Sequence, residues 1–246
     1  MIPRAVRGLR AASNVLEAVG ARTQLRAAPE DPVAALDFID AFAYGGITAA
    51  PIQVRSEILG LLELLDADRP RAVLELGTFH GGTLFLFSRV AAEDAVLVTV
   101  DLPSGLFGGG YPRSWAHFFR GFARDRQRIH LVRGDTRSRD TKTRIAALVC
   151  GKGKVDFLFI DADHRYEGVR ADYEEYAPFV REGGLIAFHD IVPGDETLVG
   201  GVPRFWNELK ASHPGAVELV EDWDQGGYGI GIIRKRAGPR TYSGSA

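Results

Sequence analysis

The segment Ala72-Val-Leu-Glu-Leu-Gly-Thr-Phe-His-Gly-Gly-Thr83 decides the fold of this chain. Its first part, Ala72–Leu76, is too short for a helix and too apolar for an exposed strand, which is typical of a buried parallel strand. Glycines follow at positions 77, 81 and 82, and a helical pattern begins at Thr83. A strand, a glycine-rich turn and a helix in succession predict the first unit of an α/β sheet, whose ligands bind beyond the carboxyl ends of the strands.

The same alternation continues along the chain. Helical stretches separate four further short apolar runs, which are Val96–Val100, Ile129–Val132, Val155–Ile160 and Leu185–Phe188. The runs Val217–Val220 and Tyr228–Ile233 flank a glycine-containing loop, a pattern that favours an antiparallel hairpin. The sequence therefore predicts a doubly wound, Rossmann-like α/β fold with a mainly parallel seven-stranded sheet and antiparallel strands at its C-terminal end.

Three regions are expected from the distribution of prolines, glycines and apolar residues. Residues 1–50 read as helical pieces broken by prolines and glycines, and we expect a helical cap or lid there. Residues 51–236 carry the strand and helix pattern and form the main domain. Residues 237–246 are small and polar, and we expect a flexible tail.

Composition restricts the function classes. Lys and Arg total 30 against 32 for Asp and Glu, a net charge of −2, which gives no electrostatic reason to expect a nucleic-acid partner. Cys150 is the only cysteine, which excludes an intrachain disulfide and a cysteine zinc site and fits the reducing cytoplasm. No run approaches the roughly 18 apolar residues that span a bilayer, so we expect no membrane partner. A small-molecule partner remains the best expectation.

The turn after the first strand offers the first candidate binding residues. Glycines in this turn let the backbone approach a ligand, and the helix that follows presents free N–H groups. The spacing differs from the dinucleotide fingerprint Gly-x-Gly-x-x-Gly, and Glu75 would repel a pyrophosphate. A cationic or zwitterionic ligand fits better, with a purely structural strand-to-helix turn as the alternative. The candidates are Glu75, Gly77, Thr78, Gly81, Gly82 and Thr83.

Polar residues also follow the next two strands. Asp101 ends the second strand and is followed by Leu102; a carboxylate there can accept hydrogen bonds from ribose hydroxyls, although an exposed loop cap is the alternative. Asp135 and Thr136 follow the third strand and offer a polar edge suited to adenine.

Acidic and imidazole side chains follow the fourth and fifth strands. The fourth strand ends at Asp161-Ala-Asp-His164 and the fifth at Phe188-His189-Asp190. Buried carboxylates and imidazoles that converge from adjacent strands are costly unless they have each other or a cation as partners. A metal site at this edge would satisfy them.

These motifs, in this order, carry a family resemblance. They are Val73–Gly82, Thr99–Pro103 with Gly108–Pro112, Arg133–Thr136, Phe159–Val169, Gly183–Ile191 and Gly201–Trp206. The chain resembles the class I S-adenosylmethionine-dependent methyltransferases, in the bacterial branch similar to macrolide-sugar O-methyltransferases and to proteins called cephalosporin hydroxylases.

The resemblance implies roles for individual residues. Glu75 and the turn up to Thr83 would surround the methionine part of S-adenosylmethionine, Asp101 would hold the ribose, and Asp135 with Thr136 would border the adenine. An Asp-x-x-His motif, here Asp161 and His164, supplies a metal ligand and a general base in the sugar methyltransferases.

In those enzymes two acidic residues after the fifth strand complete the metal site, and here His189 stands before Asp190 in place of one acid. The expected metal ligands are therefore Asp161, His189 and Asp190, for a divalent ion such as Mg²⁺, Mn²⁺ or Fe²⁺. An imidazole shifts the preference from Mg²⁺ toward Mn²⁺, Fe²⁺ or Zn²⁺. If no metal binds, His189 would be a buried hydrogen-bonded residue or a second base.

The expected function is methyl transfer to a hydroxyl of a small polar acceptor, sugar-like or phenolic, with His164 as general base. A nonhaem iron hydroxylase built on Asp161, His164 and His189 is one alternative, because two histidines and a carboxylate match the facial triad. A noncatalytic S-adenosylmethionine-binding protein is another. We also expect a homo-oligomer, because relatives of this fold often self-associate through N-terminal segments.

Overall fold

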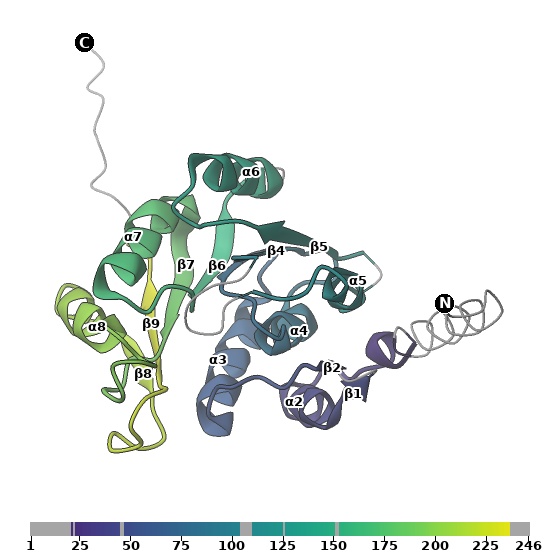
Figure 1. Cartoon of the computed structure of the whole chain (residues 1–246), viewed down its shortest axis with the longest axis horizontal. Helices are drawn as coiled ribbons and strands as arrows, with labels where there is room; N and C mark the ends of the chain where they lie inside the picture. The colour runs from purple at the N-terminus through teal and green to yellow at the C-terminus, as the bar shows by residue number, and fades with distance from the viewer. Residues whose placement is uncertain are drawn as a thin grey trace, which may run out of the picture.

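The computed structural model describes residues 21, 23–44, 47–103, 110–124, 126–150 and 153–236 (Figure 1). Seven strands form one sheet in the order β5-β4-β3-β6-β7-β9-β8. Their bounds are β3 Ala72–Leu76, β4 Val96–Asp101, β5 Arg128–Arg133, β6 Val155–Ile160, β7 Val180–His189, β8 Val217–Leu219 and β9 Ile230–Arg234. The pairings from β5 to β7 are parallel, whereas β9 is antiparallel to both β7 and β8. The predicted fold class is therefore confirmed.

The central strand β3 brings the carboxyl ends of three strands together. Glu75 is in register with Thr99 of β4 on one side and with Phe159 of β6 on the other. All five side chains of β3 are buried, as expected for a strand covered on both faces. The turns after β3, β4 and β6 are therefore neighbours at one edge of the sheet.

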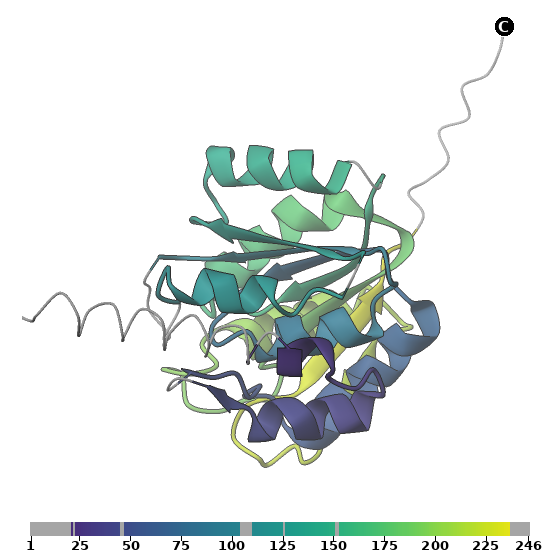
Figure 2. The same ribbon diagram turned by 90° about the vertical axis from the view of Figure 1, so that its right-hand side faces the viewer.

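Helices cover both faces of the sheet (Figure 2). Their bounds are α2 Pro32–Ala41, α3 Arg55–Asp68, α4 Gly82–Val90, α5 Trp115–Arg120, α6 Arg139–Cys150, α7 Tyr166–Tyr176 and α8 Val202–Lys210. One core cluster joins α2, α3, α4 and α5 to the sheet, and a second joins α6, α7 and α8. Along β3, Val73 packs into the first cluster and Leu74 and Leu76 into the second, as the alternation of a strand requires.

The described part of the N-terminal region packs against the first helical layer. Helix α2 begins after Asp31, whose carboxylate accepts a hydrogen bond from the Ala34 N–H at 2.9 Å, and Pro32 occupies its first turn. Phe38 stacks on Phe85 of α4 at 5.7 Å. The short strands β1 (Ala43–Tyr44) and β2 (Ile47–Thr48) pair antiparallel. Residues 1–20 of the expected cap and the expected tail 237–246 lie outside the described residues.

Three elements differ from the sequence prediction. Strand β7 begins five residues earlier than the predicted run, and its first residues after Val180 are exposed rather than apolar. The apolar spacing predicts a helix from Ser114 to Arg124, whereas helix α5 spans only Trp115–Arg120. Helix α8 was not predicted. Pro203 lies in its first turn, and Trp206 is fully buried and donates its indole N–H to Glu218 at 2.6 Å. None of the described helices is long and apolar enough to cross a membrane.

Candidate active site

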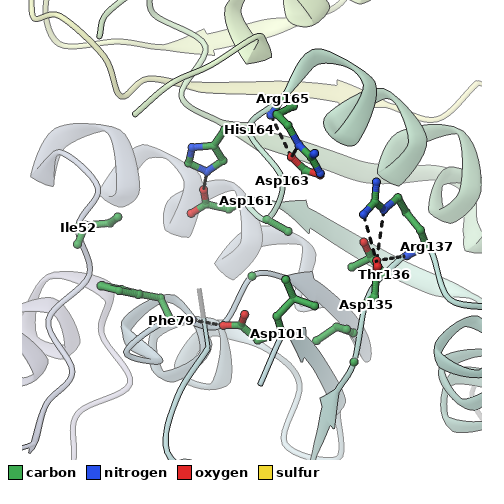
Figure 3. Close-up of a pocket in the computed structure, with 15 residues that line it drawn as sticks. Ile52, Phe79, Asp101, Asp135, Thr136, Arg137, Asp161, Asp163, His164 and Arg165 are labelled. Atoms are coloured by element: carbon green, nitrogen blue, oxygen red, sulfur yellow. Dashed lines mark hydrogen bonds and ion pairs between the residues drawn. The ribbon is translucent and has the colours of Figure 1, made fainter. Parts of the chain in front are cut away.

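A cavity of about 380 Å³ opens beyond the carboxyl ends of β3, β4, β5 and β6 (Figure 3). This volume lies in the range of small-molecule sites. Several predicted binding residues line it, namely Gly77, Asp101, Leu102, Asp135, Thr136, Asp161 and His164. A smaller adjoining cavity of about 30 Å³ shares Gly77 and Asp161 and is also lined by Thr78, Gly81, Gly82 and Thr83. The structure thus gathers residues from four separate strand ends around one space.

Gly77 is where two of these strand ends touch. Its φ is +96°, and a Cβ atom there would lie 1.9 Å from the carbonyl oxygen of Asp161. Only glycine allows both the backbone conformation and this close approach. The Asp161 N–H in turn donates to the carbonyl of Leu76 at 2.8 Å. The glycine-rich turn and the segment that carries Asp161 are therefore in direct backbone contact.

Glu75 lies beneath the turn and lines neither cavity. Its fully buried carboxyl accepts hydrogen bonds from the hydroxyls of Thr83 and Thr99, both at 2.6 Å. Burial raises the pKa of Glu75 to about 8, against the opposing effect of these two hydroxyls. In this structure its role is to tie the start of α4 to β4.

Asp101 connects the turns after β3 and β4. One carboxylate oxygen accepts hydrogen bonds from the N–H groups of Thr78 and Phe79, at 3.1 and 2.8 Å, and the other accepts one from Gly110 at 2.9 Å. Burial raises the pKa of Asp101, while these backbone donors act in the opposite direction. The carboxylate lies on the cavity wall, where a ribose could meet it.

Asp161, His164 and Asp190 form a cluster beside the larger cavity, and they offer ligand atoms that lie within 4.8 Å of one another. The Asp161 Oδ1 atom lies 3.3 Å from Nε2 of His164, and Asp190 Oδ2 lies 3.4 Å from Nδ1 of the same ring. Although burial opposes ionisation, the two imidazoles of His189 and His164 hold the pKa of Asp161 below its usual range. The cluster combines two carboxylates with at least one imidazole.

The His164 ring is oriented by its neighbours. Its Nδ1 atom donates to the carbonyl oxygen of Leu198, which leaves Nε2 as the nitrogen that can accept a proton. Burial favours the neutral ring, but the hydrogen bond and charge of Asp161 outweigh it and raise the pKa of His164 to about 9. In this arrangement the ring is therefore protonated at neutral pH.

His189 and Asp190 line neither cavity but adjoin the cluster from the end of β7. The His189 ring is buried, with Nδ1 at 3.3 Å from Asp161 Oδ1 and 3.5 Å from Asp190 Oδ1. Asp190 has a left-handed φ of 61°, and its carboxylate accepts a hydrogen bond from the Tyr228 N–H at 3.1 Å. The loop before β9 thus holds the last acid of the cluster.

The donor set fits a divalent cation. Two carboxylates and imidazole nitrogens are ligands that Mn²⁺, Fe²⁺ and Zn²⁺ accept. Within the described part of the chain, neither ring nitrogen of buried His189 makes a hydrogen bond of good geometry, although its Nδ1 lies beside the carboxylates of Asp161 and Asp190. The three residues that the structure clusters are Asp161, His164 and Asp190, with His189 adjoining them, so the predicted ligand set and the base candidate share one site.

Comparison with known proteins identifies the domain. Residues 74–191 match the family model described as a methyltransferase domain. This segment belongs to the methyltransferase family. It contains every strand end that forms the larger cavity, together with the whole Asp161, His164 and Asp190 cluster. The family resemblance stated from the sequence is confirmed.

Individual proteins are similar to parts of this chain. The uncharacterized protein y4gI of Sinorhizobium fredii is 32% identical over 155 residues, which cover 61% of this chain and 16% of that protein. Demethylmacrocin O-methyltransferase of Streptomyces fradiae is 34% identical over 96 residues, which cover 35% of this chain and 24% of the enzyme. The chain therefore spans a quarter or less of the matched relatives' length.

Among solved structures, an O-methyltransferase from Bacillus cereus in complex with SAH superposes with a TM-score of 0.52. It is 22% identical, and the match covers 75% of this chain and 84% of that one. At this identity the likeness establishes the shared fold.

Sequence reasoning missed several residues of the candidate site. Gln53 precedes α3 and donates its side-chain amide to Asp161 Oδ2 at 3.1 Å, a contact across 108 positions that no local pattern signals. Phe79 lines the cavity and stacks on His80 with ring centroids 3.8 Å apart. Ile52, Arg137, Asp163 and Arg165 also line the cavity, and the repeated Asp-x-Arg tripeptide was the available signal for the last three.

Proposed function

We propose that this protein transfers a methyl group from S-adenosylmethionine to a hydroxyl oxygen of a small polar acceptor. The observation that carries the proposal is a single cavity, inside the segment of the methyltransferase family, that runs from Asp101 and Asp135 to Asp161 and His164. The first pair would bind the ribose and adenine, and the second pair lies where a hydroxyl would lose its proton. The Gly77–Thr83 turn would hold the methionine part.

When bound, S-adenosylmethionine supplies the methyl carbon: its C–S bond breaks as the C–O bond forms, and the electron pair stays on sulfur. The protein's own task is alignment and proton removal. His164 would accept the hydroxyl proton at Nε2, because its Nδ1 is committed to the Leu198 carbonyl. Its raised pKa means that the ring must first become neutral, and positive charge brought into the cavity favours that form.

Asp161, Asp190 and the imidazole of His189 would hold a divalent cation, which leaves Nε2 of His164 to act as the base. Such a cation makes a bound hydroxyl more acidic. Gln53 would fix the second oxygen of Asp161 through its 3.1 Å hydrogen bond, so that Oδ1 remains directed toward the histidines. The proposal includes a sugar-like or phenolic acceptor, action in the cytoplasm and self-association.

The experiment is calorimetric titration of chelator-treated protein with S-adenosylhomocysteine, alone and with Mg²⁺, Mn²⁺ or Fe²⁺. Micromolar binding of S-adenosylhomocysteine is expected. NAD⁺ is the control that should not bind, because the turn after β3 lacks the Gly-x-Gly-x-x-Gly fingerprint of dinucleotide-binding proteins. A metal effect on binding, or metal binding by itself, would place the cation in the site. Absence of S-adenosylhomocysteine binding under all conditions would refute the proposal and favour the hydroxylase based on Asp161, His164 and His189.

A further inference from the structure

Two Asp-x-Arg tripeptides line one rim of the larger cavity from different loops. Asp135-Thr-Arg137 lies between β5 and α6, and Asp163-His-Arg165 lies between β6 and α7. All four charged residues line the larger cavity. Figure 3 shows both guanidinium groups on the same side of it. The same tripeptide therefore occurs twice at one rim.

Each tripeptide folds into a closed fork. The Arg137 N–H donates to Asp135 Oδ1 at 2.9 Å, and the Arg137 side chain approaches the same carboxylate at 3.4 Å. The Arg165 N–H donates to Asp163 Oδ1 at 3.1 Å, Nε donates to the same oxygen at 2.8 Å, and Nη2 pairs with the other oxygen. Each guanidinium is thus held by the acid two residues before it.

The second fork is fixed to the fold. A Cβ atom on Gly168 would lie 2.1 Å from Cγ of Asp163, so the first turn of α7 leaves room for this carboxyl only because residue 168 is glycine. The guanidinium groups remain accessible, with side-chain exposures of 50% for Arg137 and 55% for Arg165. Asp163 is thus confined by the first turn of α7, and both arginines present accessible, planar guanidinium groups to the cavity.

We propose that Arg137 and Arg165 form a clamp that binds the purine ring of the nucleoside through the planar faces of their guanidinium groups. Each positive charge is balanced by its own aspartate, so the pair favours a neutral aromatic ring over a free anion. Guanidinium groups stack well on aromatic faces, which an ammonium group does not do in the same way. The inference rests on the proposed function, because it places the adenine of S-adenosylmethionine at this rim.

The test measures the affinity of Arg165→Gln and Arg137→Gln for S-adenosylhomocysteine and for adenosine. Loss of a guanidinium–ring contact should weaken both ligands about three- to tenfold. Arg165→Lys should lie between the wild type and Arg165→Gln, because it keeps the charge but loses the plane. Arg170→Gln is the matched control, since Arg170 pairs with Glu174 at 2.8 Å on the same helix α7 and lines neither cavity.

The double variant Asp163→Asn/Arg165→Gln separates stacking from charge. In Arg165→Gln the carboxylate of Asp163 has lost its guanidinium partner. If stacking on Arg165 matters, replacing that carboxylate as well will not restore adenosine affinity. Full restoration would overturn the clamp. Variants that bind both ligands within twofold of wild type would also overturn it. So would displacement of adenosine by inorganic phosphate that depends on Arg165, because the forks would then be an anion site. Wild-type protein that binds adenosine but not S-adenosylhomocysteine would refute the proposed function and leave the clamp standing.

Discussion

The buried carboxyl of Glu75 should make the wild-type protein less stable as the pH rises. In the folded protein burial raises the pKa of Glu75 to about 8, against an ordinary value of 4.5 for an unfolded chain. Below pH 4.5 both states hold the proton and the group has no effect on stability. Above that pH the unfolded chain loses the proton first, so the free energy of unfolding falls until the folded pKa is passed.

The size of this effect follows from the two pKa values. A pH of 7 lies about 2.5 units above the ordinary pKa of Glu75, and each unit is worth about 1.4 kcal/mol, a loss of about 3 kcal/mol. The substitution Glu75→Gln keeps the shape of the side chain and removes the titration. The difference in unfolding free energy between this variant and the wild type should therefore grow by about 3 kcal/mol between pH 4.5 and 7.

Urea unfolding of both proteins across this pH range is the assay, and the difference between them cancels the contribution of every other titrating group. Thr83→Val removes one hydroxyl donor to the carboxyl, so the decline of its stability should extend to higher pH than in wild type. Parallel pH profiles for wild type and Glu75→Gln would refute the reasoning. A wild type that gains stability relative to the variant as the pH rises would refute it as well.

Three further outcomes test the site. Asp101→Asn should weaken S-adenosylhomocysteine binding at least about tenfold in calorimetry, since the carboxylate holds two turns by backbone N–H groups; unchanged affinity would contradict the ribose assignment. His164→Ala should lower turnover by about 10² or more while keeping cofactor affinity, whereas equal loss of both would mean a structural histidine. Glu57 accepts a hydrogen bond from the Gly229 N–H at 2.8 Å and so holds the loop behind Asp190. Glu57→Ala should therefore weaken Mn²⁺ binding about tenfold and leave S-adenosylhomocysteine affinity intact. Unchanged Mn²⁺ binding with weakened S-adenosylhomocysteine binding would refute this reasoning.

The sheet could be predicted because most of its strands are continuous apolar runs, which can be recognised in a short stretch of sequence. The structure has strands at Ala72–Leu76 and Val155–Ile160, where continuous apolar runs predicted them. Strand β7 was predicted only in part, because Arg181 and Glu182 at its start are exposed and break the apolar run. Helix α8 was missed although local signals were present, since a proline begins it and its buried residues, Val202, Phe205 and Trp206, recur at helical spacing.

The residues of the candidate site likewise fall into those that could be predicted from the sequence and those that could not. Asp101, Asp161 and His164 could be found because each follows a strand that ends at the ligand-binding edge. Gln53 could not, since its contact with Asp161 depends on how the segment before α3 packs across the sheet edge. Glu75 was expected to contact the ligand, and its position beneath the turn follows from pairing with Thr83 and Thr99, which sequence spacing does not show.

The backbone contact at Gly77 has a consequence for redesign of this protein. The main chain at Gly77 rests on the carbonyl of Asp161. The separation between the ends of the cavity that we propose for the methyl donor and for the acceptor is therefore set by peptide groups rather than by side chains. Libraries that seek new acceptors can therefore vary exposed rim positions such as Ile52 without altering the line of attack. Changes at residue 77 itself would displace both halves of the reaction together.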